Sequence, residues 1–265
     1  MKAHVWLFPL LVAGFLLPGL LRADPFPDPD MDPADVIAAT PGLTVYKTKA
    51  KGWDDGKFGV CIPTSYQADQ PMPLVVSAHG HGGNGPGEAQ AWNGLAEKYK
   101  FILVCPSYYS SAAVSGQSVA DDDVMLKEVM TRVLGSLNID RRKVLHTGFS
   151  GGSLATWYVA AEHDNWFTAL CLRSGNFYGD PPLHLSRWQQ RPIYIMWGEK
   201  DMTDIPEQGQ RMLDFVQKTI GNEKVKHEVI PGGYHEGHPD RVAKWFAGLT
   251  DDDFEPPDPD APIHL

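Results

Sequence analysis

The sequence predicts an α/β protein built on an open, mainly parallel β-sheet with helices on both faces. The first observation behind this prediction is that strand-like and helix-like segments alternate along most of the chain. The second is residues 72–78 (Met-Pro-Leu-Val-Val-Ser-Ala), a continuous apolar run of the kind that is buried on both faces of a parallel sheet. Together they favour one large domain with a sizeable core.

The first half of the alternation begins with strand-like segments at 43–49 and 57–66, ahead of the strand at 72–78. A helix over 88–100 and a strand over 101–105 are expected next. Apolar residues then recur at helical spacing and predict an amphipathic helix, with Asp121, Asp122 and Asp123 at the end where the helix dipole favours negative charge. These apolar residues are Leu126, Val129, Met130, Val133, Leu134 and Leu137.

The second half continues the same pattern to the end of the domain. Its expected elements are a strand at 143–147, a helix carrying Leu154, Trp157, Tyr158 and Ala161, strands at 169–173 and 192–197, a helix over 205–220 that ends at Gly221, a strand at 226–230, and a last helix carrying Val242, Trp245, Phe246 and Leu249. No internal repeat is visible.

Residues 1–23 have the order of a secretory signal peptide. A short, weakly basic start is followed by an apolar stretch over 5–17, and Pro18 and Gly19 then lead to the small residue Ala23. A membrane anchor is the alternative, but the apolar run is short and interrupted by prolines. We therefore expect cleavage after Ala23 and a secreted or periplasmic protein with no stable membrane anchor.

The remaining chain divides by composition into three parts. Residues 24–42 are rich in Asp and Pro and predict a flexible lead-in. Residues 43–250 form the predicted domain. Residues 251–265 carry six acids, four prolines and no Lys or Arg, which predicts a disordered acidic tail.

The net charge limits the classes of partner, and the cysteine spacing limits the disulfides and metal sites that are possible. The formal net charge of −10 becomes −12 when cleavage removes Lys2 and Arg22 but no acid, which argues against nucleic acid or an anionic membrane as partner. Cys61, Cys105 and Cys171 are an odd number at wide spacing, without metal-ligand spacing. Buried thiols are expected, although an oxidising compartment would permit one disulfide.

Residues 148–152 (Gly-Phe-Ser-Gly-Gly) contain the candidate nucleophile, Ser150. A G-x-S-x-G pattern is weak evidence alone, but this one lies between the predicted strand at 143–147 and a predicted helix, which is the setting of a nucleophile elbow. Gly148 and Gly152 are expected because such a turn leaves no room for a Cβ where strand and helix meet. The alternative is a Gly/Ser turn that only packs a helix on a sheet.

Residues 78–85 (Ala-His-Gly-His-Gly-Gly-Asn-Gly) follow the strand at 72–78 and predict an oxyanion loop. In this arrangement the residue after the nucleophile, Gly151, supplies one backbone amide, and we expect His81 to supply the other. His79 and His81 could instead bind a metal, but no acid or thiol lies nearby to complete the ligand set. A phosphate-binding loop would need a Lys or a dinucleotide pattern, and neither is present.

The acid and base are expected beyond later strands, in the order Ser, Asp, His. Asp201 follows the strand at 192–197 and is the first choice for the acid. Asp204 is the alternate, although a capping box with Glu207 would account for it, and Glu199 is weaker. His235 lies in a glycine-containing loop after the strand at 226–230.

Two other histidines are weighed against His235. His238 is the alternate base, but it directly precedes Pro239 and the last helix, which suits a helix-entry residue. His146 lies inside the strand before the elbow and is expected to pack in the core.

These motifs together resemble a known family. Residues 79–84, 139–144 and 148–152, with 198–201 and 233–235, resemble polyhydroxybutyrate depolymerase-like and feruloyl or acetylxylan esterase-like secreted hydrolases of the α/β-hydrolase superfamily. The resemblance spans about residues 43–249. It implies the α/β-hydrolase fold and hydrolysis of carboxylic esters through an acyl-enzyme, with a Ser150–Asp201–His235 triad and no cofactor or metal. Members often have several disulfides, which three isolated cysteines do not provide.

Two rival functions remain open, as does the substrate. A serine peptidase of the prolyl-oligopeptidase type has the same elbow, and a hydrolase fold without activity could bind a glycan or a partner. The stretch 174–191 is short, so we expect little or no lid and an open site for a small-molecule, polysaccharide-linked or polyester-linked ester. Four aromatic residues near strand ends could form a wall for a sugar or phenolic ring, or could be ordinary packing: Tyr108, Tyr109, Phe177 and Tyr178.

Overall fold

The computed structural model describes residues 35–50, 55–108, 116–163, 165–175, 177 and 186–254. The predicted signal peptide, most of the lead-in and most of the acidic tail lie outside these residues, as do Tyr109 and Tyr178. Of residues 116–120 only the helical backbone is described.

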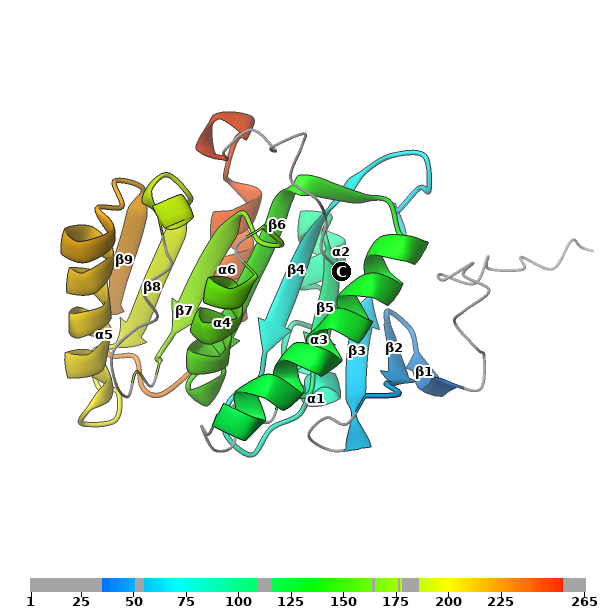
Figure 1. Cartoon of the computed structure of the whole chain (residues 1–265), viewed down its shortest axis with the longest axis horizontal. Helices are drawn as coiled ribbons and strands as arrows, with labels where there is room; N and C mark the ends of the chain where they lie inside the picture. The colour runs from blue at the N-terminus through cyan, green and yellow to red at the C-terminus, as the bar shows by residue number, and fades with distance from the viewer. Residues whose placement is uncertain are drawn as a thin grey trace, which may run out of the picture.

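The described residues form one nine-stranded sheet (Figure 1). Its strands in spatial order are β1 (Val36–Thr40), β2 (Leu43–Lys47), β3 (Lys57–Cys61), β5 (Ile102–Pro106), β4 (Met72–Ala78), β6 (Ile139–Phe149), β7 (Ala169–Arg173), β8 (Ile193–Gly198) and β9 (Val225–Ile230). The pairs from β1 to β5 are antiparallel, and those from β5 through β9 are parallel. The carboxyl ends of β4, β6, β7, β8 and β9 therefore meet at one edge.

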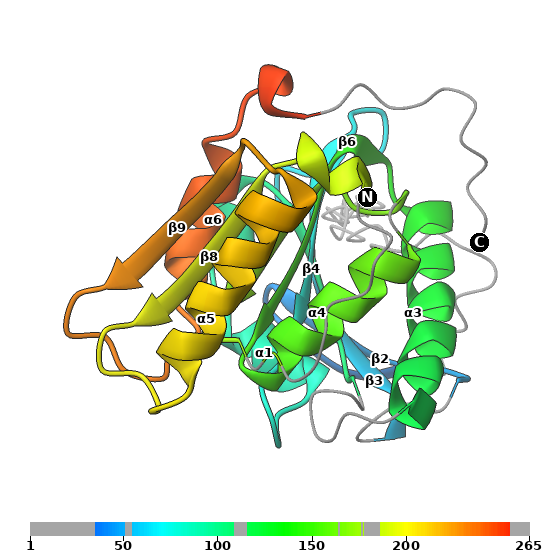
Figure 2. The same cartoon turned by 60° about the vertical axis from the view of Figure 1, so that its left-hand side comes forward.

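Helices cover both faces of the sheet (Figures 1 and 2). The helices α3 (Gly116–Ser136), α4 (Gly151–Glu162) and α5 (Ile205–Asp214) lie on one face, and α1 (Gly85–Ala91), α2 (Leu95–Tyr99) and α6 (Pro239–Ala247) lie on the other. After α5 the chain continues as a π-helix over Phe215–Ile220, which ends at Gly221 in the left-handed conformation with φ of 74°. The predicted fold class is thus confirmed.

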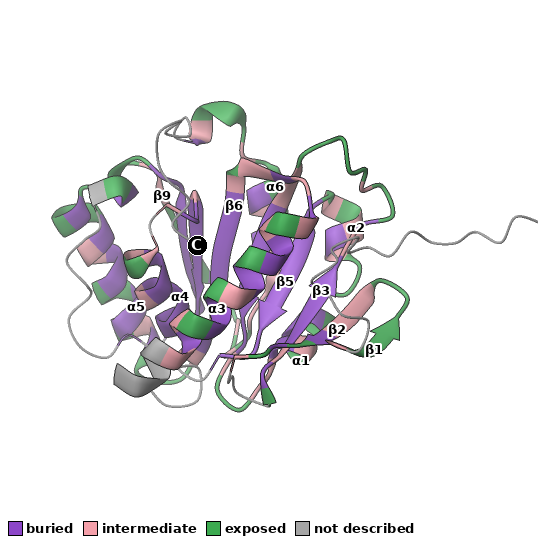
Figure 3. Ribbon diagram, turned by 45° about the vertical axis from the view of Figure 1, so that its right-hand side comes forward, coloured by how far each residue is buried: buried purple, intermediate pink, exposed green. Residues whose placement is uncertain are grey.

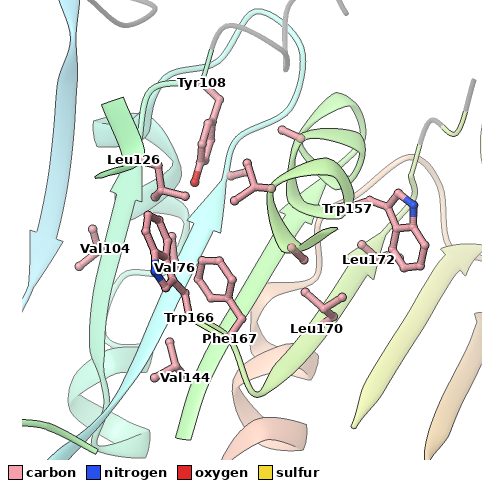
Figure 4. Packing of buried hydrophobic residues seen from close by; sticks show 14 of the residues in the cluster. Val76, Val104, Tyr108, Leu126, Val144, Trp157, Trp166, Phe167, Leu170 and Leu172 are labelled. Atoms are coloured by element: carbon pink, nitrogen blue, oxygen red, sulfur yellow. The ribbon is translucent and has the colours of Figure 1, made fainter. Parts of the chain in front are cut away.

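Two apolar layers hold helices to the sheet, and the central strands β5, β4 and β6 are largely buried (Figure 3). On the α4 face, Trp166 and Phe167 pack beside Val76, and Trp157 of α4 lies over Leu172 (Figure 4). Burying a large apolar side chain stabilises a fold by roughly 1.5–3 kcal/mol, so these layers fix the strand ends that carry the site. On the opposite face α1, α2 and α6 supply the apolar side chains.

The structure corrects three of the predicted elements. Strand β1 lies within the expected flexible lead-in; all five of its residues are exposed, so no hydrophobic pattern marks it. The single helix expected over 88–100 is two helices, because Gly94 takes a left-handed conformation with φ of 74°. The acidic tail starts as a turn of 3₁₀ helix at Asp251–Asp253, anchored by the buried ring of Phe254 against Phe246.

Candidate active site

Ser150 occupies a sharp turn between β6 and α4. Its φ of 54° and ψ of −121° are unusual for a residue with a side chain, and such conformations cost on the order of 1–3 kcal/mol. The turn is held by two backbone hydrogen bonds, from the amide of Ser150 to the carbonyl of Arg173 (2.8 Å) and from the amide of Ser153 to the carbonyl of Ser150 (3.0 Å). The side chain of Ser150 is therefore fixed at the carboxyl edge of the sheet.

The two glycines of the motif are required by close backbone approach. A Cβ at Gly148 would lie 2.1 Å from the carbonyl oxygen of Gly152, and a Cβ at Gly152 would lie 2.4 Å from the carbonyl oxygen of His79. Both distances are far inside van der Waals contact. The steric reason predicted for these glycines is confirmed.

A hydrogen-bonded chain joins Ser150, His235 and Asp201. The Nε2 atom of His235 lies 2.9 Å from the Oγ of Ser150, and its Nδ1 atom lies 2.6 Å from an oxygen of Asp201. A carboxylate can only accept, so Nδ1 carries the proton and Nε2 is free to accept from the serine hydroxyl. Ser150 is 8% exposed and the Asp201 side chain is fully buried, whereas the His235 side chain is 23% exposed, so of the three residues the imidazole is the most accessible to solvent.

Asp201 is held by three further donors besides the imidazole. The hydroxyl of Ser174 donates to Oδ2 (2.6 Å), as does the amide of Gly198 (3.2 Å), and the amide of Met202 donates to Oδ1 (2.7 Å). Both carboxylate oxygens therefore accept hydrogen bonds from donors other than the imidazole. The carboxylate is thus fixed in position and aimed at His235.

The alternate residues lie elsewhere. Asp204 is the N-cap residue of α5, where the helix start was expected, but its carboxylate makes no capping hydrogen bond and accepts instead from the side chain of Gln208 (2.7 Å), so the hydrogen bond of the predicted capping box is not formed. The Glu199 carboxylate accepts from the amide of Gly232 (2.7 Å). His238 is the residue before α6, with φ of 42°, and its Nε2 is buried without a hydrogen-bond partner among the described residues.

His79 stabilises the loop after β4, a role that sequence reasoning missed. The backbone amide of Tyr108 donates to its Nε2 (3.0 Å), so the ring proton is on Nδ1 and points to the carbonyl of Gly80 (2.8 Å). His79 therefore ties the loop to the end of β5 and is buried, whereas His81 is exposed. Its contact with Tyr108 lies 29 residues away in sequence, and no local pattern signals it.

A buried ion pair lies beneath the site and was also missed. An Arg173 Nη2 lies 2.7 Å from a Glu88 oxygen that accepts from Ser77 (2.6 Å) and Trp92 (2.9 Å) as well. Burial alone would raise the pKa of Glu88, but the charge of Arg173 and these hydrogen bonds outweigh it and hold the pKa below its ordinary value. The only signal in the sequence is an arginine that ends the otherwise apolar strand β7.

The other predicted residues have ordinary structural roles. Tyr108 and Phe177 are buried, so packing is the correct interpretation for these two aromatic residues. His146 is a core residue as predicted; burial lowers its pKa to about 3, and its ring stacks on Phe167 with centroids 4.5 Å apart. The cysteines are free and buried, and burial raises the thiol pKa of Cys61 to about 11.

The described residues contain neither a membrane-spanning helix nor a metal-binding cluster. In that part of the chain, no helix is long and apolar enough to span a membrane. The same residues contain no group of three His, Cys, Asp or Glu side chains arranged to hold a metal ion.

The chain is similar in sequence and in fold to known esterases. No protein-family profile matches the chain. A probable feruloyl esterase C of Aspergillus oryzae is 30% identical over 131 residues, which are 46% of this chain and 47% of that protein. The chain thus spans about half the length of the curated relatives it matches.

Two solved structures show how closely the fold is shared. The acetyl xylan esterase of Aspergillus awamori has a TM-score of 0.59 at 21% identity and covers 77% of this chain and 98% of its own. An S-formylglutathione hydrolase of Agrobacterium tumefaciens has a TM-score of 0.62 at 13% identity, with 80% and 98% covered.

The class that these findings define is the α/β-hydrolase fold. The resemblance to feruloyl and acetylxylan esterases is confirmed by the sequence relatives. The likeness to polyhydroxybutyrate depolymerases stays a prediction.

Proposed function

We propose that this protein is a secreted serine hydrolase that cleaves carboxylic esters through an acyl-enzyme. The observation that carries the proposal is the continuous hydrogen-bonded chain from Ser150 through His235 to Asp201. Ser150 is the nucleophile, His235 is the general base, and Asp201 orients the imidazole and stabilises its charged form.

The proposed reaction has two halves that use the same base. His235 Nε2 takes the Ser150 proton as Oγ attacks the ester carbonyl, and it then gives that proton to the departing alcohol oxygen. Water next transfers a proton to Nε2 as it attacks the acyl-enzyme. That proton returns to Ser150 Oγ when the carboxylic acid leaves, which restores the starting state.

The backbone amides of Gly151 and His81 are proposed to bind the oxyanion. Gly151 is the first residue of α4, where amides have no partner within the helix and where the helix dipole favours negative charge. His81 is exposed in the loop that His79 ties down, and among the described residues neither amide donates a backbone hydrogen bond. Donors aimed at the developing charge are worth roughly 10²–10³-fold each in kcat.

The names of the relatives support a proposal for the substrate class. Several of them are named feruloyl or acetylxylan esterases, so we propose an acyl group esterified to a polysaccharide as the substrate. The predicted signal peptide would bring the enzyme to such an extracellular polymer. The N-terminal sequence of the mature protein tests secretion, and we expect it to begin at Asp24.

Hydrolysis of a nitrophenyl ester by wild type and Ser150→Ala tests the proposal. Loss of turnover by several orders of magnitude in the variant is expected. Equal rates for the two proteins would contradict it. A panel of esters and chromogenic peptides separates the rival chemistry, since a clear preference for peptides would indicate a peptidase.

A further inference from the structure

The dipeptide Arg173–Ser174, at the end of β7, contacts all three segments that carry the candidate triad. The carbonyl of Arg173 accepts from the amide of Ser150 (2.8 Å), and an Nη1 of Arg173 donates to the carbonyl of Gly237 (3.2 Å). The hydroxyl of Ser174 donates to Asp201 (2.6 Å). One short segment thus bonds to the nucleophile turn, the histidine loop and the acid.

Arg173 is itself held rigidly from below. Its guanidinium donates to Glu88 (2.7 Å), to the hydroxyl of Ser77 (2.9 Å) and to the hydroxyl of Thr147 (3.1 Å). The side chain is 1% exposed, and its partner Glu88 carries a negative charge because its pKa is lowered. A planar guanidinium with three fixed acceptors has one orientation, which places Nη1 within hydrogen-bonding distance of the carbonyl of Gly237.

The bond to Gly237 joins Arg173 to the loop that carries His235. Gly237 is two residues beyond His235, in a loop that is also held by a hydrogen bond from the amide of Lys200 to the carbonyl of Gly233 (2.7 Å) and by the His235 ring, which lies 4.9 Å from the ring of Phe149. Glycine-rich backbone is conformationally free, so each external contact reduces the range of positions that it can take. A Cβ at Gly237 would lie 3.1 Å from Nη1 of Arg173, so the loop backbone sits directly on the guanidinium.

Ser174 adopts a backbone conformation that suits glycine. Its φ is 45°, in the left-handed region, yet the residue has a side chain and is 1% exposed. The hydroxyl lies between the Asp201 carboxylate and, at 3.5 Å, the carbonyl of Glu236. What serine supplies here beyond glycine is this hydroxyl, whose single proton is donated to the acid at 2.6 Å.

We propose that Arg173 and Ser174 are positioning residues for hydrolysis. They hold the side chains of His235 and Asp201 at hydrogen-bonding distance along the chain that leads to Ser150. The role rests on the proposed function. Neither side chain touches the reacting atoms. Both act on the geometry of proton transfer, so their loss lowers kcat and leaves KM nearly unchanged.

Two substitutions of Ser174 separate the hydroxyl from the backbone strain. Ser174→Ala and Ser174→Gly both remove the hydrogen bond to Asp201, and Ser174→Gly also relieves the positive φ. We expect kcat for a nitrophenyl ester to fall about 10- to 100-fold in both variants, with KM within about twofold of the wild-type value. Ser174→Gly should have a higher Tm than Ser174→Ala, because glycine accepts the positive φ. Wild-type kcat in a folded Ser174→Gly would overturn the role of the hydroxyl.

Removing Arg173 alone would leave the charge of Glu88 buried without a partner and could unfold the protein. The variants that test Arg173 therefore avoid that unpaired charge. Arg173→Met combined with Glu88→Gln removes both charges, and Arg173→Lys keeps the charge without the planar fork. We expect the double variant to lose at least about tenfold in kcat and Arg173→Lys to retain an intermediate value. Wild-type kcat in Arg173→Lys, or in the double variant when it folds, would overturn the role of Arg173.

Thr168→Val is the matched control. The hydroxyl of Thr168 accepts from the amide of Val144 (3.0 Å) just before β7, at the opposite edge of the sheet from the site. This variant should lower Tm and leave kcat unchanged. If wild type and Ser150→Ala behave as the proposed function requires but the Arg173 and Ser174 variants keep wild-type kcat, only the positioning role fails. If wild type hydrolyses no ester, the proposed function fails, and the positioning role fails with it.

Discussion

The backbone of Gly152 lies so close to the carbonyl of His79 that a Cβ on Gly152 would be 2.4 Å from that oxygen. This contact joins the nucleophile turn to the loop proposed to bind the oxyanion. Because the opposing atoms are backbone, they cannot move aside as a flexible side chain would.

Gly152→Ala is therefore expected to destabilise the fold by at least about 2 kcal/mol and to reduce esterase activity, since the two loops must separate. Gly248→Ala is the control; its Cβ would have its nearest heavy atom at 3.4 Å, and it should change stability by less than about 0.5 kcal/mol. Denaturant unfolding of both variants measures the difference. Equal stability of Gly152→Ala and wild type would show that the two backbones are not in contact.

His235 and His238 form a matched pair for testing the base. His235→Ala should lower kcat by about 10⁴-fold or more, because it removes the group 2.9 Å from Ser150 Oγ. His238→Ala should keep kcat within about tenfold, since that histidine lies before α6 and 3.8 Å from Glu236. Steady-state kinetics of both variants on one ester measures the two kcat values. A larger loss of kcat in His238→Ala than in His235→Ala would make His238 the base.

Asp201 and Asp204 form a similar pair for the acid. Asp201→Asn should lower kcat by about 10³- to 10⁴-fold, because an amide can donate to Nδ1 and favour the wrong imidazole tautomer. Asp204→Asn keeps an oxygen for Gln208 and should have little effect on kcat. If Asp201→Asn retained full activity while Asp204→Asn lost it, the assignment of the acid would be wrong.

His146 should make stability depend on pH. Its pKa is about 3 in the fold against about 6.5 when unfolded, so the unfolded chain binds one more proton between these values. The free energy of unfolding contributed by the neutral ring is complete above pH 6.5 and falls as the pH drops toward 3, by up to about 5 kcal/mol.

His146→Phe should remove that dependence. Denaturant unfolding at pH 4 and pH 7 is expected to give a smaller loss of stability on acidification for this variant than for wild type. His227→Gln, at an exposed position on the edge strand β9, should keep the wild-type slope. Identical slopes for His146→Phe and wild type would mean that His146 is not buried in the neutral form.

The fold could be predicted well wherever burial leaves a periodic pattern. Strands β2 to β8 overlap their expected positions because each contains apolar residues that are buried in the sheet, whereas in β9 only Ile230 is buried. Strand β1 could not be found, since all five of its residues are exposed and only its pairing with β2 defines it. The break at Gly94 depends on one backbone conformation that a helical sequence pattern does not reveal.

The same distinction holds at the site. Ser150, Asp201 and His235 each follow a recognisable strand, so topology alone indicates that they meet at one edge of the sheet. Arg173 and Glu88 are 85 residues apart, and nothing near either residue signals the other. Sequence reasoning therefore reached the candidate triad but not the ion pair beneath it.

The central claim is that Ser150 is an activated nucleophile, and covalent trapping tests it most directly. Wild-type protein and Ser150→Ala are treated with a fluorophosphonate, digested and examined by mass spectrometry. The account predicts one adduct in the wild type, on the peptide that contains Ser150, and none in the variant. An unlabelled wild-type protein of intact fold, or an adduct on any other residue, would contradict it.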